Sequence, residues 1–240
     1  MTDETSLTVL VPVDVSTQER PDPELLQLLG PANVVLVGWY PVPDQTAPGQ
    51  LQAEHESEAV DRIEAVAADL PDDGPAVDTV VVFTHDRATT VDRLAEDTAS
   101  DVVVVPNDVT VAERVLVPIR GDVNMDRILG VVGGLLEDDE VSVTLFHATA
   151  EGDTDPSVGE LLLDSAADAL AEDGIDPDRI ERLHVTTESP VDEIVDAAAN
   201  HDVVVIGETE PSLVERVLGD VPSEIIDRSG RPVLVVRNVE

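Results

Sequence analysis

The chain has 240 residues and a formal net charge of −39, because 52 residues are Asp or Glu and only 13 are basic, all of them arginine. Hydrophobic residues make up 42%, which is too apolar for a disordered acidic segment, and the sequence has no basic stripe that could neutralise nucleic-acid phosphates. The absence of cysteine excludes disulfides, cysteine-ligated iron–sulfur clusters and thiolate zinc sites.

The excess of acidic residues is better explained by adaptation to a high-salt solvent than by a binding partner. A carboxylate surface without lysine repels itself at low salt, whereas at multimolar salt the Debye length falls to about 3 Å and the repulsion is screened. We therefore expect a halophilic protein. No apolar run is long enough to span a membrane, and Met1–Leu10 lacks the features of a signal peptide, so we expect a cytoplasmic protein without direct membrane insertion.

The chain contains an internal repeat. The stretch "VLVPVD" at Val9–Asp14 returns as "VLVPIR" at Val115–Arg120, and "DVVVV" at Asp101–Val105 returns as "DVVVI" at Asp202–Ile206. Self-similarity at offsets of about 100 residues indicates two copies of one structural unit.

Short apolar β-branched runs alternate with helical patterns in both copies. Such runs predict strands that are covered on both faces, and hence a parallel sheet. In chain order, the expected strands are Val9–Pro12, Val34–Val37, Val80–Phe83, Val102–Val105, Val115–Pro118, Val141–Phe146, Leu183–Thr186, Val203–Ile206 and Val233–Val236.

The first copy is shorter than the second. Only Pro106–Glu113 separate its fourth strand from the next repeat, which is too short for a crossover helix and a fifth strand. We therefore expect two tandem units, residues 1–112 and residues 113–240, of which the first lacks its last helix and strand.

Helical patterns complete the alternation. Pro190–Asn200 has apolar residues at helical spacing with Ser189 as a candidate cap, and a second helix is expected to begin at Ser212. Gly130–Leu136 is expected to be a helix whose glycines allow close packing on the sheet. The fold predicted from this order is an α/β, Rossmann-like, doubly wound sheet, in which ligands bind beyond the carboxyl ends of the strands.

Two such units, opened by "VLVPVD" and closed by "DVVVIGETE" and "GDVPSEIIDRSGRPVLVVRN", resemble the tandem form of the universal stress protein family over nearly the whole chain. The resemblance implies a fold like that of the adenine nucleotide alpha hydrolases. In the family's ATP-binding branch, the loop after strand four reads Gly-x-x-Gly, nine residues, then Gly-Ser or Gly-Thr. Here Gly207 matches the first glycine, Glu210 replaces the second, and Gly219 is followed by Asp220.

These departures bear on phosphate binding. Glu210 does not permit the backbone freedom of glycine, and an ionised Asp220 cannot donate a hydrogen bond to phosphate. Asp220 has two alternative roles: it caps a helix at Ser223–Arg228, or it holds Mg²⁺ that bridges to a phosphate.

The nucleoside end of the implied site is divided between the units. The family's aspartate at the end of strand one is kept as Asp14 but is replaced by Arg120 in the second unit, where it either pairs with Asp122 or Asp220 or contacts an anionic ligand. The candidate binding residues are Pro118, Ile119, Arg120, Gly207, Glu208, Thr209, Gly219, Asp220, Val221 and Asp14.

Other side chains give weaker signals. The five histidines show no metal-ligating spacing, and His147 is expected near the rim of the second pocket. Trp39 and Tyr40 either line the mouth of the first pocket or are buried under the loop that follows them.

The leading functional hypothesis is a stress-response or regulatory protein with degenerate nucleotide sites and no catalytic residues. One alternative is a protein that binds ATP or AMP with Mg²⁺ and hydrolyses it slowly; another is a dimerisation module linked to a membrane transporter. Because the first unit lacks a fifth strand, we expect Arg231–Arg237 to be free to pair between chains in a homodimer.

Overall fold

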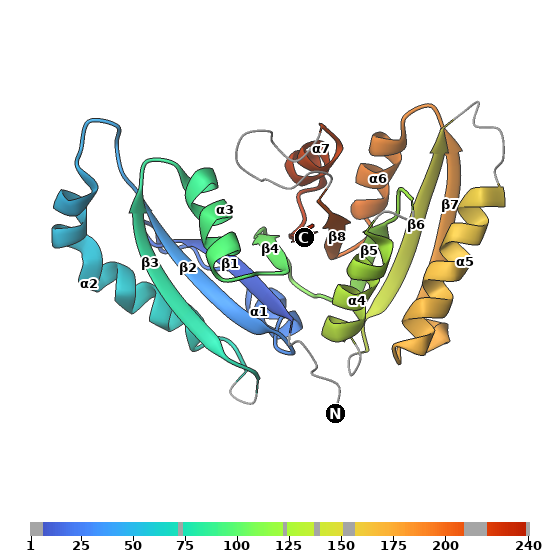
Figure 1. The fold of residues 1–240 in the computed structure, drawn as a ribbon, viewed down its shortest axis with the longest axis horizontal. Helices are drawn as coiled ribbons and strands as arrows, with labels where there is room; N and C mark the ends of the chain where they lie inside the picture. Colours follow the sequence, from blue (N-terminus) through green and yellow to red (C-terminus); the bar gives the residue numbers. More distant parts are fainter. Residues whose placement is uncertain are drawn as a thin grey trace.

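The computed structural model describes residues 7–71, 74–121, 124–136, 140–150, 157–208 and 220–238, with the side chains of residues 220–223 left out. Within these ranges the strands form a single sheet (Figure 1). All nine expected strands are confirmed, and several extend further than the apolar runs: β1 (Thr8–Asp14), β2 (Asn33–Pro41), β3 (Val77–Thr84), β4 (Val102–Val105), β5 (Arg114–Pro118), β6 (Ser142–Ala150), β7 (Ile180–Thr187), β8 (Val203–Gly207) and β9 (Val233–Val236).

Helices connect these strands. They are α1 (Pro23–Leu28), α2 (Pro48–Ala67), α3 (Arg87–Asp97), α4 (Met125–Leu136), α5 (Ser157–Glu172), a short 3-10 turn η1 (Pro177–Arg179), α6 (Pro190–Ala198) and α7 (Asp220–Ser229). The helix expected from Ser212 lies outside the described residues. Among the described helices, none combines the length and apolar character that crossing a bilayer requires.

Two local predictions about helices are wrong. Ser189 precedes α6 but its side chain caps nothing; instead its backbone N–H donates to Thr187 Oγ1 at 3.1 Å. The glycines of α4 do not bring it close to the sheet. Gly130 and Gly134 have no neighbour within 4 Å of an added Cβ, and Gly133 approaches the side chain of Asp173.

The strand order is β3-β2-β1-β4-β9-β8-β5-β6-β7. Each half places its first strand between its second and its fourth, and these pairings are parallel. Residues 106–113 join β4 to β5 without a helix or strand.

Strand β9 corrects the expectation of a free edge. It pairs in parallel with β8 and antiparallel with β4, where Val102 lies opposite Val236 and Val105 lies opposite Val233. Because the first half has no fifth strand of its own, the outer edge of β4 is unpaired until β9 fills it. Both edges of β9 are therefore used within the chain, and the predicted route to a homodimer through this strand is wrong.

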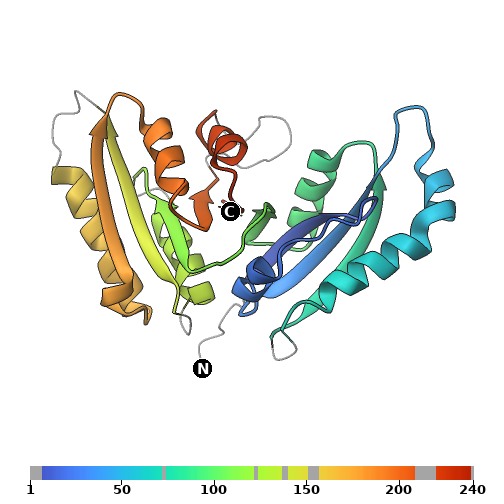
Figure 2. The same ribbon diagram turned by 180° about the vertical axis from the view of Figure 1, so that it is seen from behind.

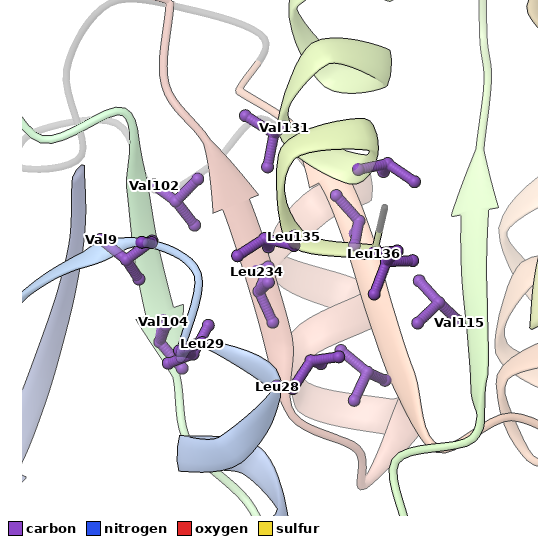
Figure 3. Close-up of a cluster of buried hydrophobic side chains, with 14 of the residues drawn as sticks. Val9, Leu28, Leu29, Val102, Val104, Val115, Val131, Leu135, Leu136 and Leu234 are labelled. Carbon is purple, nitrogen blue, oxygen red and sulfur yellow. The ribbon is translucent and has the colours of Figure 1, made fainter. Parts of the chain in front are cut away.

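One hydrophobic cluster crosses the junction between the halves (Figure 3). Leu234 of β9 lies among Val102 and Val104 of β4, Leu29 just after α1 and Leu135 of α4, and all five residues are almost completely buried. The opposite face carries α3 in the first half and α6 and α7 in the second (Figures 1 and 2). The ends of β5, β6 and β8 thus lie beneath helices of the second half.

Candidate ligand-binding site

A cavity of about 660 Å³ lies at the carboxyl ends of β5, β6 and β8. Five of the predicted binding residues meet on its wall: Pro118, Ile119, Arg120, Gly207 and Glu208. Parallel pairing of β5 with β6 and β8 brings these strand ends together, as expected for an open α/β sheet.

The cavity wall is mostly apolar. Ile128 of α4, Ile194 of α6 and Ile225 of α7 face Phe146 and Ile206 from the sheet. Its volume falls within the range of about 300–1,000 Å³ that is typical of small-molecule pockets, and such pockets combine apolar walls with a few polar groups. The arrangement suits a ligand with a flat or compact apolar body.

Gly207 allows a helix to approach the end of β8. A Cβ added at this position would lie 2.8 Å from Ile128 Cδ1. The resemblance assigns this glycine to phosphate binding, whereas the contact seen here is with the side chain of α4. This packing favours glycine at the position, although the end of the Ile128 side chain can shift to relieve the contact.

Glu208 is held on the cavity wall with 4% of its surface exposed. Its backbone N–H donates to Val236 O at 2.8 Å, and its carboxylate Oε2 accepts from the N–H of Asn238 at 3.1 Å. Burial raises the pKa of Glu208; the Asn238 hydrogen bond and the charge of Arg237 oppose this shift, and Asp92 adds to it. Burial therefore works against ionisation of this carboxyl group, while Asn238 and Arg237 favour its ionised form.

Two histidines lie side by side next to the cavity, with ring centroids 5.6 Å apart. His147 shares a hydrogen bond through Nδ1 with Ile119 O at 2.7 Å, and His184 Nε2 bonds Thr149 Oγ1 at 2.8 Å. His147 lines the cavity, which confirms its expected place near the rim. Among the described residues, no group of three or more candidate ligands could hold a metal ion.

Arg120 lies on the cavity wall with its side chain exposed. The described ion pairs do not include it. Its two predicted partners cannot be compared, since Asp122 and the side chain of Asp220 lie outside the described residues. Contact with an anionic ligand remains a prediction.

The loop expected to bind phosphate is described only at its two ends. Thr209, Glu210 and Gly219 lie outside the described residues. Helix α7 begins at Asp220, three residues before the predicted start, so Asp220 and Val221 belong to its first turn. The capping role of Asp220 stays a prediction, because its side chain lies outside the described residues.

Asp14 lies apart from this cavity, in the first half. Its Oδ1 accepts hydrogen bonds from the N–H of Ser16 at 2.8 Å and from Ser16 Oγ at 2.6 Å. The Arg87 guanidinium sits 5.3 Å from the centre of the Trp39 ring; burial lowers the pKa of Arg87, and the nearby Asp14 charge opposes this shift. The charge and planar surface of this corner are thus already engaged by its own side chains.

Tyr40 also has internal partners. Its ring stacks on His55 with centroids 5.1 Å apart and on Phe83 with centroids 5.0 Å apart. The aromatic residues at the end of β2 therefore pack against their own half of the sheet.

Sequence reasoning missed the part of the wall that comes from helices. Ile128 of α4, Val191 and Ile194 of α6, and Ile225 of α7 line the cavity, as does Asn124 just before α4. Their apolar spacing predicts a buried helix face but does not show which residues lie over a strand end. Asn238 could have been found, since it closely follows a strand.

Comparison with known proteins agrees with this architecture. A model of the universal stress protein family matches residues 112–237, which is more than half of the chain. A universal stress protein from Archaeoglobus fulgidus DSM 4304 is 16% identical, with 97% of each chain covered and a TM-score of 0.63. A protein from Pseudomonas aeruginosa PAO1 is 13% identical over 97% of this chain and 93% of that one, with a TM-score of 0.53.

A structure of a universal stress protein in complex with cAMP covers 52% of this chain and 97% of its own, at 25% identity and a TM-score of 0.45. No curated protein matches the chain. With its matching family model and a sheet order repeated in both halves, the chain belongs to the universal stress protein family.

Proposed function

We propose that the protein is a stress-response regulatory protein made of two units, residues 1–112 and 113–240, in which the second unit binds one small adenine-type ligand. The observation that carries this proposal is the 660 Å³ cavity at the carboxyl ends of β5, β6 and β8, whose wall includes five of the candidate residues. Ligand occupancy would then report a cellular condition to a partner.

We propose no second ligand site of this kind in the first unit. Asp14 is hydrogen-bonded to Ser16, and Arg87 lies over the Trp39 ring that a planar ligand would need. A ligand would have to displace these contacts before it could bind, which favours one occupied site per chain.

Slow hydrolysis of ATP or AMP with Mg²⁺ is the weaker alternative. It needs a phosphate beside Gly207 and Gly219 and a cation at Asp220. Glu208 follows Gly207 directly and lines the same cavity, so its carboxylate, when ionised, adds a negative charge near that phosphate. Two like charges about 4 Å apart cost about 4 kcal/mol at an effective dielectric of 20. This cost supports regulation rather than phosphate chemistry.

We further propose a cytoplasmic, high-salt setting and a protein partner, which could be a transporter or another regulatory protein. A homodimer that extends the sheet would need the outer edge of β3 or of β7, since these are the terminal strands of the described sheet. Sedimentation in about 3 M KCl at several protein concentrations separates a monomer from such a dimer.

Thermal unfolding with added ligand tests the proposed binding function. In about 3 M KCl, adenosine or AMP should raise the unfolding midpoint of the wild type, since a ligand at 100 times its dissociation constant adds about 2.7 kcal/mol. Ala148→Trp should abolish this rise by filling the cavity, whereas Ala53→Trp on the exposed face of α2 should keep it. A midpoint unchanged by every adenine ligand would rule out the proposed function.

A further inference from the structure

The position of Glu208 on the cavity wall is fixed from several sides. Its N–H donates to Val236 O at 2.8 Å, and its carbonyl oxygen accepts from Asn124 Nδ2 at 3.4 Å. The residue lines the cavity and is 4% exposed. A carboxylate is therefore a built part of this wall and not a surface charge that can swing into solvent.

The hydrogen bonding of this carboxylate is incomplete. Oε2 accepts from the N–H of Asn238, whereas Oε1 is buried and has no hydrogen-bond partner among the described residues. Buried acceptors are paired in most proteins, because an unpaired one loses its hydration without compensation. A group that donates a hydrogen bond from within the cavity would remove this deficit.

The nearby charges act on the carboxylate in opposite directions: Arg237 favours its ionised form and Asp92 opposes it. Arg237 is 7% exposed, and its guanidinium donates through Nη1 to Ser100 O at 3.3 Å. No ion pair joins it to Glu208 within the described part of the chain. Asp92, which is 5% exposed, adds a second negative charge that acts on Glu208. Glu208 is thus a buried carboxyl group without an ion pair among the described residues, and a further anion placed beside its ionised form is disfavoured.

From this arrangement we propose that the cavity selects an uncharged or cationic ligand, such as a nucleoside, that donates a hydroxyl or amino hydrogen to Glu208, and that it disfavours the phosphorylated form. This inference rests on the proposed function and specifies its ligand class. Because Oε1 is covered by neighbouring atoms, meeting the donor requires the carboxylate to turn about its last side-chain bond and to exchange its hydrogen bond with the Asn238 N–H for one with the ligand. The apolar body of the ligand packs against Ile128, Ile194 and Ile225.

The expected selectivity follows from Coulomb's law. A phosphate oxygen about 4 Å from an ionised Glu208 weakens binding roughly 5-fold in a water-like environment and roughly 1,000-fold at an effective dielectric of 20. High salt reduces this effect only in part, since buried charges are screened less than exposed ones. Arg120, which follows β5 and is exposed on the same wall, would offset this repulsion if it bound the phosphate. Equal binding of nucleoside and nucleotide would be the sign of such an offset.

Titration calorimetry with adenosine, AMP and ATP in about 3 M KCl provides the test. In the wild type, adenosine should bind at least about tenfold more tightly than AMP or ATP. Glu208→Gln keeps the shape and the acceptor for Asn238 but removes the charge. It should therefore reduce the preference for adenosine over AMP to about threefold or less, chiefly by strengthening AMP binding. Glu172→Gln, an exposed change of the same charge at the end of α5, should leave the wild-type ratio unchanged.

Failure of this inference is distinct from failure of the proposed function. If AMP binds as tightly as adenosine and Ala148→Trp abolishes both, the ligand site stands and the selectivity is wrong. An adenosine preference that persists in Glu208→Gln would also overturn the assigned role of Glu208. If none of the three ligands binds the wild type, the proposed function and this inference fall together. The wild-type ratio alone decides the selectivity, even if the variant is poorly folded.

Discussion

Leu234→Ala should destabilise both halves of the molecule together. Leu234 is 0% exposed and lies in β9, which is hydrogen-bonded to β8 of the second half and to β4 of the first. Its neighbours come from several elements of a packed junction (Figure 3), so the site cannot collapse easily around a shortened side chain. Buried Leu→Ala changes cost about 2–5 kcal/mol, and we expect about 3–5 kcal/mol here.

This loss is large enough to measure by thermal unfolding. For a chain of this size each kcal/mol shifts the midpoint by about 2–4 °C, so Leu234→Ala should lower it by about 6–20 °C. Circular dichroism in about 3 M KCl gives the midpoint, and amide exchange of β1 and β5 reports the two halves separately. Leu161→Ala is the control, since Leu161 is 67% exposed on α5 and should change stability by less than about 0.5 kcal/mol.

Two results would show that β9 does not couple the halves. If Leu234→Ala weakens the protection of β5 while β1 keeps its wild-type exchange rate, β9 does not couple the halves. Two well-separated unfolding transitions in the wild type would likewise show that the halves unfold independently, because a shared strand predicts a single transition.

Gly159→Ala should destabilise the chain by about 1–3 kcal/mol, because its Cβ would lie 2.6 Å from His147 Cδ2 and 2.7 Å from His184 Nε2. Gly134→Ala has no neighbour within 4 Å of the added Cβ and should stabilise α4 by about 0.5–1 kcal/mol. Equal unfolding midpoints for the two variants would contradict this. The pKa of Glu208 is raised in the folded state, so its contribution to stability is fully present below the ordinary carboxyl pKa and is lost as pH rises through the raised pKa. A pH series of unfolding midpoints should therefore be flatter in Glu208→Gln, and an identical slope would count against the shift. Lowering KCl from about 3 M to about 0.1 M should reduce the wild-type midpoint, since the net charge of −39 loses its screening, and a constant midpoint would argue against salt adaptation.

Much of the fold could be predicted because its signals are local. Runs such as Val102–Val105 and Val233–Val236 are apolar and β-branched, and they form buried strands as their composition indicates. The choice of partners for these strands could not be predicted in the same way. The pairing of β9 with β4 depends on an edge left open about 130 residues earlier, and nothing in the four residues of either strand encodes it.

The candidate site was predictable where it follows the strands. Pro118, Ile119 and Gly207 lie at strand ends, and the rule that ligands bind beyond the carboxyl ends of parallel strands brings them to one cavity. The helical wall was not predictable, because the residues of α4 and α6 that face the cavity depend on how each helix is rotated on the sheet. Glu208 shows the same limit: its charge favours exposure, yet Asn238 and Val236 hold it in the buried wall.

A crystal structure of the protein grown with adenosine in high salt tests the central claim most directly. The account predicts one nucleoside per chain, enclosed by Ile128, Ile194 and Ile225 with a hydroxyl or amino group directed at Glu208. A ligand bound beside Asp14 in the first half, or a nucleotide whose phosphate rests against Gly207 and Glu208, would contradict it.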